Sequence, residues 1–400
     1  MSTEIPGVRQ EEVVVDEQLA IEHQPSATPQ SLWRRLVEGD LGSLRVLLVL
    51  AIIWTVFAVQ NDRFLTATNL TNLALQIAAV GTISVGVVLV LLLGEIDLSV
   101  GAVSGLSASI MAVLAEQHGW SAPSAILAGL CTGAVIGLFQ GTIVTWLEIP
   151  SFVVTLAGLL GWQGVQLKVL GETGTVNVTT PGIVDIAGTF LASWLGWLLA
   201  FAAIAVVLGG GLLDRARRAR ADLELEPIGM LVIRVVFSSA AVLISVAIMN
   251  SDRGVPLSTM ILIAFVVFFN WLVTRTRWGR HLMATGGNIE AARRAGVGVR
   301  GLRTMVFVLA STMAAAGGIL AASRLLAVNQ SSGSGDLLLL SIAGPVIAGV
   351  SLFGGRGSVW GALTGALVIG SISNGMDLLG YESAVKFMVT GAVLLGAVVL

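Results

Sequence analysis

Twelve long apolar segments alternate with short polar ones along this chain, and no other feature limits the fold as much. A helix that crosses a lipid bilayer needs roughly 20 apolar residues. The apolar segments cover residues 44–60, 73–93, 98–116, 123–147, 152–169, 187–212, 228–249, 256–274, 304–323, 337–353, 359–379 and 384–400. Three of them, 98–116, 152–169 and 337–353, are short or rich in glycine, so they are candidates for re-entrant or broken helices. We therefore expect an all-α polytopic membrane protein with about 10–12 transmembrane helices.

The composition agrees with a membrane protein. Of the 400 residues, 55% are hydrophobic and only 12% are charged, and the mean hydropathy is +0.91. Soluble domains have about a quarter of their residues charged. Residues 1–30 differ from the rest, because they are acidic and lack the apolar core of a signal peptide. We expect a disordered acidic cytoplasmic tail over 1–30 and a transmembrane domain over 31–400.

The basic residues set the orientation, because loops on the cytoplasmic side carry more Lys and Arg. If the N-terminus is cytoplasmic and the segments alternate in direction, 17 of the 22 Lys and Arg residues lie inside and 5 lie outside or near that end. A basic stretch at 215–220 then forms a cytoplasmic loop that anchors this topology. The longest polar interruption, Arg275 to Arg303 (the central loop), also becomes cytoplasmic and holds seven arginines.

The middle of the central loop predicts a short helix. Asn288 is a suitable N-cap, and Glu290 lies in the first turn, where the helix dipole favours an anion. Glu290 can pair with Arg294 one turn later. Gly296 is a stop signal. From the pattern alone, this helix either lies among the lipid headgroups or docks into a groove of a soluble partner.

Two carboxylates, Glu95 and Asp97, stand at the junction of two apolar segments. Carboxylates inside a membrane are costly and often bind ions or protons. The predicted topology places this pair at the inner boundary, where water can reach them. There, Asp97 could instead cap a helix that starts at Leu98, with Ser99 in its first turn.

Pairs of glycines four residues apart recur in the apolar segments, as in Gly101–Gly105, Gly133–Gly137 and Gly361–Gly365. Small residues at this spacing let helices approach closely. We expect them to pack the bundle tightly or to form a contact between two copies of the chain.

Several polar or aromatic side chains inside the apolar segments have the chemistry to contact a sugar, through planar hydrogen-bonding groups or ring faces. These candidates for a substrate path are Gln76, Trp162, Gln163, Asn270, Asn374 and Asp377. The same residue types also form hydrogen bonds between helices, so both uses stay open.

Enzyme motifs do not occur in the chain. Of the two lysines, Lys168 is followed by Val169 and Lys386 by Phe387, so the Gly-x-x-x-x-Gly-Lys-Ser/Thr motif of a Walker A loop cannot occur. The three histidines are scattered, and no serine lies in a Gly-x-Ser-x-Gly motif. We therefore expect a non-enzymatic protein with no cofactor, no bound metal and no nucleic-acid partner.

Four stretches in order resemble the permeases of ATP-binding-cassette (ABC) importers for monosaccharides. The stretches are Gly94–Gly101, Ile149–Gly158, Gly286–Gly296, and Gly354–Ser358 followed by Ser373–Met376. The resemblance runs from about residue 45 to the end and is greatest to the xylose type, because of an additional membrane region at 187–255. The acidic tail departs from the family pattern. The chain also stops at Leu400 in apolar sequence, so we expect the last span to be incomplete.

The resemblance implies a function and a set of residues. The function would be import of a monosaccharide, foremost D-xylose, across the bacterial cytoplasmic membrane. The partners would be ABC ATPase subunits, an extracytoplasmic sugar-binding protein and a second permease copy. The residues that insert into the ATPase would be Gly286, Gly287, Asn288, Glu290, Ala291, Ala292, Arg293 and Gly296, and the family motif would include Glu95, Asp97, Ser99 and Gly101. The alternatives are another sugar, such as ribose or arabinose, or an ion-coupled secondary transporter that uses Glu95 and Asp97.

Overall fold

The computed structural model describes residues 41–223 and 228–399. Contacts divide the chain into two units, 1–45 and 46–400, and the architecture below is that of the second unit. The predicted acidic tail, residues 1–30, lies outside the described residues.

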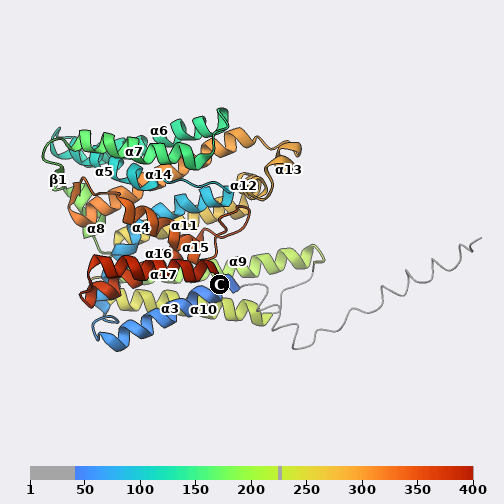
Figure 1. Ribbon diagram of the computed structural model, residues 1–400. Helices are drawn as coiled ribbons and strands as arrows, with labels where there is room; N and C mark the ends of the chain where they lie inside the picture. Colours follow the sequence, from blue (N-terminus) through green and yellow to red (C-terminus); the bar gives the residue numbers. More distant parts are fainter. Residues whose placement is uncertain (1–40, 224–227, 400) are drawn as a thin grey trace, which may run out of the picture. The chain divides into compact units, whose positions relative to one another are not determined.

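Every one of the twelve apolar segments folds as a helix, and the all-α polytopic class is confirmed. The long helices are α3 (Leu41–Gln60), α4 (Ala67–Leu93), α5 (Val100–Glu116), α6 (Ala122–Trp146), α7 (Ser151–Leu170), α9 (Ser193–Arg220), α10 (Ile228–Asn250), α11 (Leu257–Arg275), α14 (Val299–Leu325), α15 (Gly335–Ile347), α16 (Trp360–Leu378) and α17 (Ser383–Val399). Three short helices, α8 (Pro181–Gly188), α12 (Arg277–Gly287) and α13 (Ile289–Arg294), lie between them. Figure 1 shows the long helices running along one common direction.

Seven helices in the described part of the chain are long and apolar enough to cross a membrane: α4, α6, α7, α9, α10, α11 and α14. Of the three segments that were candidates for re-entrant or broken helices, α5 and α7 are continuous helices and so are not broken. The third segment is broken, because α15 ends at Ile347 and residues 348–359 continue in non-helical backbone. Pro345 lies inside α15 near this end, and Gly349 has a left-handed φ of 86°, which turns the chain out of the helix.

We predicted a loop for the basic stretch at 215–220, but the structure shows that it forms the end of α9. This helix has 28 residues and is therefore about 42 Å long, longer than the ~30 Å hydrocarbon core of a bilayer. Its arginines follow an apolar run, and arginine is a good helix former, so the helix continues through them.

The core of the bundle consists of α4 and α14. The chain itself buries 83% of the most apolar window of α4 and 72% of that of α14, whereas it buries 11% for α9 and none for α10. α4 packs against α14, α16, α11 and α15, and α14 packs against α6 and α5. α9 and α10 pack mainly against each other, so the rest of the chain leaves most of their surface uncovered.

The predicted glycine pairs are used for close packing inside the chain. A Cβ atom at Gly133 would lie 2.5 Å from the Ser311 carbonyl oxygen of α14, and one at Gly137 would lie 2.4 Å from that of Phe307. Only glycine lets the backbones of α6 and α14 come this close. This contact explains how two helices without large interlocking side chains at these positions pack together.

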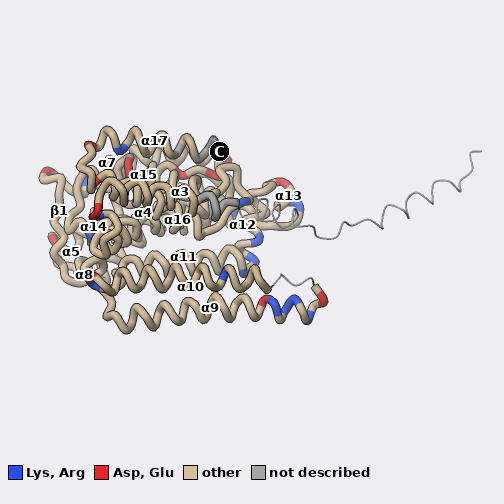
Figure 2. The backbone as a smooth tube through the Cα atoms, turned by 90° about the horizontal axis from the view of Figure 1, so that it is seen from below, with Lys and Arg blue, Asp and Glu red and all other residues tan. Residues whose placement is uncertain are grey.

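The polar segments gather at the two ends of the helices, and charges are concentrated there (Figure 2). One end contains α12 and α13 and is called the α12 end below. The other end contains α8 and a two-stranded antiparallel sheet of β1 (Thr175–Asn177) and β2 (Ala327–Asn329), and is called the β1 end. The strands join the segments that follow α7 and α14, and neither strand was predicted.

We predict that Gly137→Ala destabilises the protein, whereas Gly161→Ala does not. The added methyl group at 137 collides with backbone of α14, and overpacking of this kind costs about 1–3 kcal/mol. A Cβ at Gly161 meets no atom within 4 Å, and alanine is the better helix former. Thermal unfolding in detergent measures the stability change of each variant. Equal unfolding temperatures for the two variants would contradict the packing described for α6 and α14.

Candidate functional site

At the α12 end, one face of α12 is buried against the core, and we call this buried face the seat of α12. In α12, Leu282 and Thr285 are buried, and Trp278 and Met283 pack against the core. The buried positions recur every three to four residues, as in an amphipathic helix. The side chain of Thr276 accepts a hydrogen bond from the Gly279 backbone N–H and starts the helix. α12 was not predicted, because its arginines conceal this periodicity.

The helix α13 projects from this seat, and its cap is the predicted one. The Asn288 side-chain oxygen accepts a hydrogen bond of 2.9 Å from the Ala291 backbone N–H. Glu290 pairs with Arg293 at 3.3 Å, not with Arg294 as predicted. Ala292 is buried, whereas the other five residues of the helix are exposed or half-buried. Gly296 follows with a left-handed φ of 82° and ends the motif.

Three chain segments meet directly below these helices through glycine backbone. The Gly355 N–H donates a hydrogen bond of 2.9 Å to the Leu92 carbonyl at the end of α4. A Cβ at Gly286 would lie 1.9 Å from the same carbonyl oxygen, and one at Gly354 would lie 2.6 Å from the Gly286 carbonyl oxygen. We call Gly94, Gly286, Gly287, Gly354 and Gly355 the glycine junction. It brings together three of the four stretches that carry the family resemblance.

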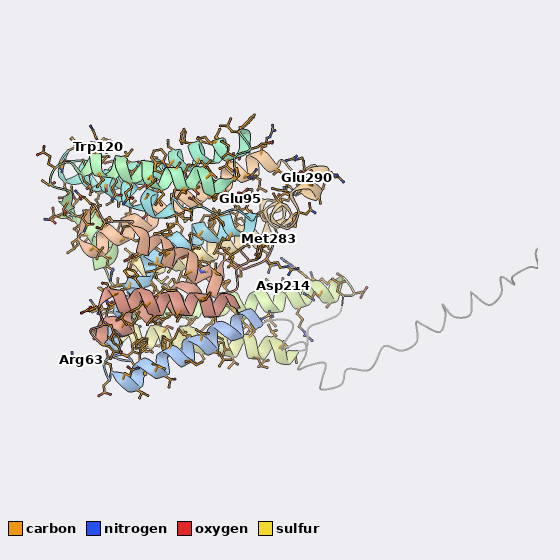
Figure 3. The ribbon with its side chains drawn as sticks, viewed as in Figure 1. Arg63, Glu95, Trp120, Asp214, Met283 and Glu290 are labelled. Atoms are coloured by element: carbon orange, nitrogen blue, oxygen red, sulfur yellow. The ribbon has the colours of Figure 1, made fainter. Side chains whose placement is uncertain are left out.

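Glu95, just beyond the junction, forms an ion pair with Arg303 on α14. The two side chains are only 13% and 17% exposed. A second pair, Glu148 with Arg300, joins the same region but is 68% and 61% exposed, with an N–O distance of 3.5 Å. Figure 3 shows Glu95 and Glu290 toward the α12 end and Arg63 at the β1 end. Glu95 therefore connects the end of α4 to the beginning of α14.

Asp97 is buried and organises the turn that leads into α5. Its carboxylate accepts hydrogen bonds from the Ser99 N–H at 2.8 Å and the Ser99 hydroxyl at 2.6 Å. The predicted start at Leu98 is wrong by two residues, because Ser99 is the N-cap and α5 begins at Val100. Burial raises the pKa of the Asp97 carboxyl, while the two hydrogen bonds oppose that rise. Its geometry is that of a structural turn residue.

Two more members of this stretch make specific contacts. The Ser99 hydroxyl also lies 3.0 Å from the Gln140 side-chain oxygen on α6. A Cβ at Gly101 would lie 2.5 Å from the Gly333 carbonyl oxygen, so α5 packs closely against the segment after β2. The stretch thus ties the beginning of α5 to α6 and to the segment after β2.

Two neighbouring cavities, of about 380 and 200 Å³, lie toward the β1 end between the core helices. Both are lined by Gln76, Val80 and Arg324. Asp336 lines the larger cavity and Asp377 the smaller one. Their walls combine amide, hydroxyl and charged groups with small apolar side chains, a lining that can form hydrogen bonds with a polar solute.

The structure brings together three of the six predicted path residues. Gln76 and Asp377 line the cavities, and the buried Asn374 side chain lies behind them, with its amide nitrogen 3.5 Å from the Gln76 oxygen. Trp162 instead packs edge-to-face on Phe139, with ring centroids 6.0 Å apart. Gln163 and Asn270 are half-buried on α7 and α11 and line neither cavity.

Arg324 was not among the predicted path residues, although the sequence contains a signal for it. It is the single charged residue between positions 304 and 335. A lone cation in a long apolar run is costly and therefore suggests function. It is the one basic side chain that lines both cavities.

A family model described as "Branched-chain amino acid transport system / permease component" matches residues 69–398. The chain is 34% identical to the xylose transport system permease protein XylH of Escherichia coli (strain K12) over 324 residues, 81% of each chain. XylH of Haemophilus influenzae is also 34% identical, over 81% of this chain and 86% of its own. The autoinducer 2 import system permease protein LsrC of Escherichia coli (strain K12 / DH10B) is 28% identical over 81% of this chain and 76% of its own. No solved structure matches significantly.

We predict that Glu95→Gln destabilises the protein and that Glu148→Gln does not. Removal of one partner from the half-buried pair leaves Arg303 without its charged acceptor, at a cost of about 1–3 kcal/mol. The exposed Glu148–Arg300 pair contributes about 0–1 kcal/mol. Double-mutant cycles with Arg303→Gln and Arg300→Gln, measured by unfolding temperature, compare the two coupling energies. If the coupling energy of Glu95 with Arg303 is no larger than that of Glu148 with Arg300, burial does not strengthen the ion pair, and the prediction is wrong.

Proposed function

Because the chain belongs to the permease family matched above, it is a transport subunit of an ABC importer rather than an enzyme, and we propose that it imports a monosaccharide, D-xylose foremost. It is a multi-pass protein of the bacterial inner membrane, and a permease of this class works with ATPase subunits and a binding protein. Family membership also removes the support for an ion-coupled transporter that uses Glu95 and Asp97. Both carboxylates have structural partners, Arg303 and Ser99.

The docking of α12 and α13 to an ATPase subunit carries the proposal. An amphipathic seat holds α12 in place, and α13 presents Glu290, Ala291 and Arg293 to the exterior. A helix that only floated among lipid headgroups would need no backbone-to-backbone anchorage such as the glycine junction. The family resemblance of Gly286–Gly296 to ATPase-coupling loops supports the same role.

The α12 end would then be the cytoplasmic end, with the N-terminus on the same side. The basic residues of the central loop and of the end of α9 support this orientation. Contacts between the ends of helices that are distant in sequence agree with alternating spans: Arg275 pairs with Asp214 at the α12 end, and Asn61 donates a hydrogen bond to the Leu378 carbonyl at the other end.

In this scheme the β1 end faces the binding protein, which delivers the sugar to the two cavities. Gln76 and Asp377 would contact the sugar hydroxyls, with Arg324 as a further donor. A second copy of the chain would complete the path. Ribose, arabinose and other small polyhydroxylated molecules are the competing substrates, and the relative named for autoinducer 2 shows that one family carries different cargo.

The coupling would run through the glycine junction. When ATP binding closes the ATPase pair, the docked α13 moves, and α12 transmits the movement to the end of α4 and to the loop after α15. Both segments contact α12 through backbone, so no flexible side chain can absorb the motion.

We predict that Glu290→Arg uncouples transport, while the protein still folds and inserts. The reversed charge faces the docked ATPase and removes the Glu290–Arg293 pair on the exposed surface. The control is Asp222→Arg, an exposed charge reversal beyond the end of α9 and outside α12 and α13. In liposomes with the ATPase and the binding protein, wild type and control should show xylose uptake and retain ATPase on co-purification. Undiminished uptake by Glu290→Arg would refute the docking role, and uptake of another sugar in place of xylose would refute the substrate assignment alone.

We also predict that Gln76→Ala lowers sugar uptake about tenfold, because one lost hydrogen bond in a desolvated site is worth about 1–3 kcal/mol. ATPase co-purification should stay unchanged. The matched control is Gln163→Ala, the same substitution at a predicted residue outside the cavities. If Gln163→Ala impaired uptake more than Gln76→Ala, the sugar would pass along α7 instead.

A further inference from the structure

Arg324 lies where the two cavities at the β1 end meet. It lines both of them, together with Gln76 and Val80 on α4. Arg324 belongs to the last turn of α14, where the C-terminal end of the helix dipole favours a cation. The chain then turns at Leu326, whose φ of 55° is left-handed, and enters β2, which also belongs to the wall of the larger cavity. A solute that moves from one cavity to the other therefore passes the Arg324 side chain.

The carboxylates around Arg324 leave its guanidinium available for a solute. Asp336 lines the larger cavity and Asp377 the smaller one. Asp377 attracts Arg324 electrostatically, but it forms its ion pair with Lys386 on α17. In the part of the chain that the structure describes, no group accepts a hydrogen bond from the Arg324 guanidinium. The N–H donors of this group are therefore not used by the protein itself.

The charges that line the cavities balance each other. Each cavity has one basic side chain, Arg324, and one carboxylate, which is Asp336 in the larger cavity and Asp377 in the smaller one. The other polar side chains of the larger cavity are the hydroxyl groups of serines and the amides of Gln76 and Asn329. An anion therefore gains no net attraction from these walls, whereas a neutral solute with several hydroxyl groups finds donors and acceptors on all sides.

A guanidinium can recognise one particular arrangement of neutral hydroxyl groups. Its N–H donors lie in one plane, and two of them form a rigid fork with parallel directions. Hydroxyl groups on adjacent carbons of a sugar ring place two oxygen acceptors side by side, so one fork can bind both. A lysine ammonium is a point charge and does not impose this geometry.

We propose that Arg324 determines the specificity of the path, because its guanidinium binds two hydroxyl groups on adjacent carbons of the sugar. The amide of Gln76, which lines both cavities as well, binds a further hydroxyl group. Lys386 contributes indirectly, because its ion pair with Asp377 keeps this carboxylate from closing onto Arg324. The inference rests on the sugar import proposed above and adds which part of the sugar the chain recognises.

The test measures the binding of two matched ligands to the full chain in lipid nanodiscs, without an ATPase or a binding protein. One ligand, 1,5-anhydroxylitol, carries hydroxyl groups on adjacent ring carbons. The other is its 3-deoxy derivative, whose remaining hydroxyl groups are on carbons that are not adjacent. Ligand-observed NMR gives a dissociation constant for each, and D-xylose is titrated in parallel.

Two variants and one control separate the geometry of the fork from its charge. Arg324→Gln removes both, and Arg324→Lys keeps the charge alone. The matched control is Arg63→Gln, which changes an exposed arginine at the β1 end that lines neither cavity. Thermal unfolding checks that each variant is folded, and if Arg324→Gln is not, Arg324→Lys decides the test.

We expect wild type and Arg63→Gln to bind 1,5-anhydroxylitol at least about tenfold more tightly than its 3-deoxy derivative, because hydrogen bonds to a charged group are strong. In Arg324→Gln and Arg324→Lys, this preference should fall to about threefold or less, while the affinity for the derivative changes little.

An unchanged preference in either Arg324 variant would overturn the proposal. So would tighter binding of D-xylonate than of D-xylose to the wild type, because Arg324 would then recognise an anion. If the wild type bound neither D-xylose nor 1,5-anhydroxylitol, the sugar path itself would be refuted, and this inference with it.

Discussion

Direct backbone contact at the glycine junction is the constraint on which the α12 end depends. A side chain at Gly286 would occupy the position of the Leu92 carbonyl oxygen, and the Gly355 N–H already uses that oxygen as its acceptor. Three chain segments can therefore share this small volume only as glycine backbone. The end of α4, the end of α12 and the segment after α15 are held together by this contact.

A second requirement shapes the polar groups near the junction. Charges are expensive in and near lipid unless they are paired or hydrogen-bonded. Glu95 satisfies this requirement with Arg303. Asp97 satisfies it for one carboxylate oxygen, which accepts from Ser99, while its other oxygen is buried without a hydrogen-bond partner. The same carboxylates that made an ion-coupled transporter conceivable therefore hold the turns between helices in place.

Much of the fold was predictable from the sequence, because helices that cross a membrane require long apolar segments. Those runs located the twelve helices, and Asn288 located the start of α13 correctly. The pairing of Glu290 with Arg293 rather than Arg294 was not predictable, because both spacings are allowed on a helix. The cavities, the role of Arg324 in lining them and the pairing of β1 with β2 depend on contacts between residues far apart in the chain. Local periodicity carries no information about such contacts. For the same reason the sequence could not show that Gln76 lines the cavities and that Trp162 does not.

The pairing of β1 with β2 has a mechanical consequence. Val176 faces Val328 across the two strands, so the segments that leave α7 and α14 are fastened to each other although about 150 residues separate them. The strands adjoin the larger cavity, because Ala327, Val328 and Asn329 belong to its wall. A movement that widens this cavity must either break the three-residue pairing of β1 with β2 or move α7 and α14 together. The short sheet thus links the end of α7 to the end of α14 beside this cavity.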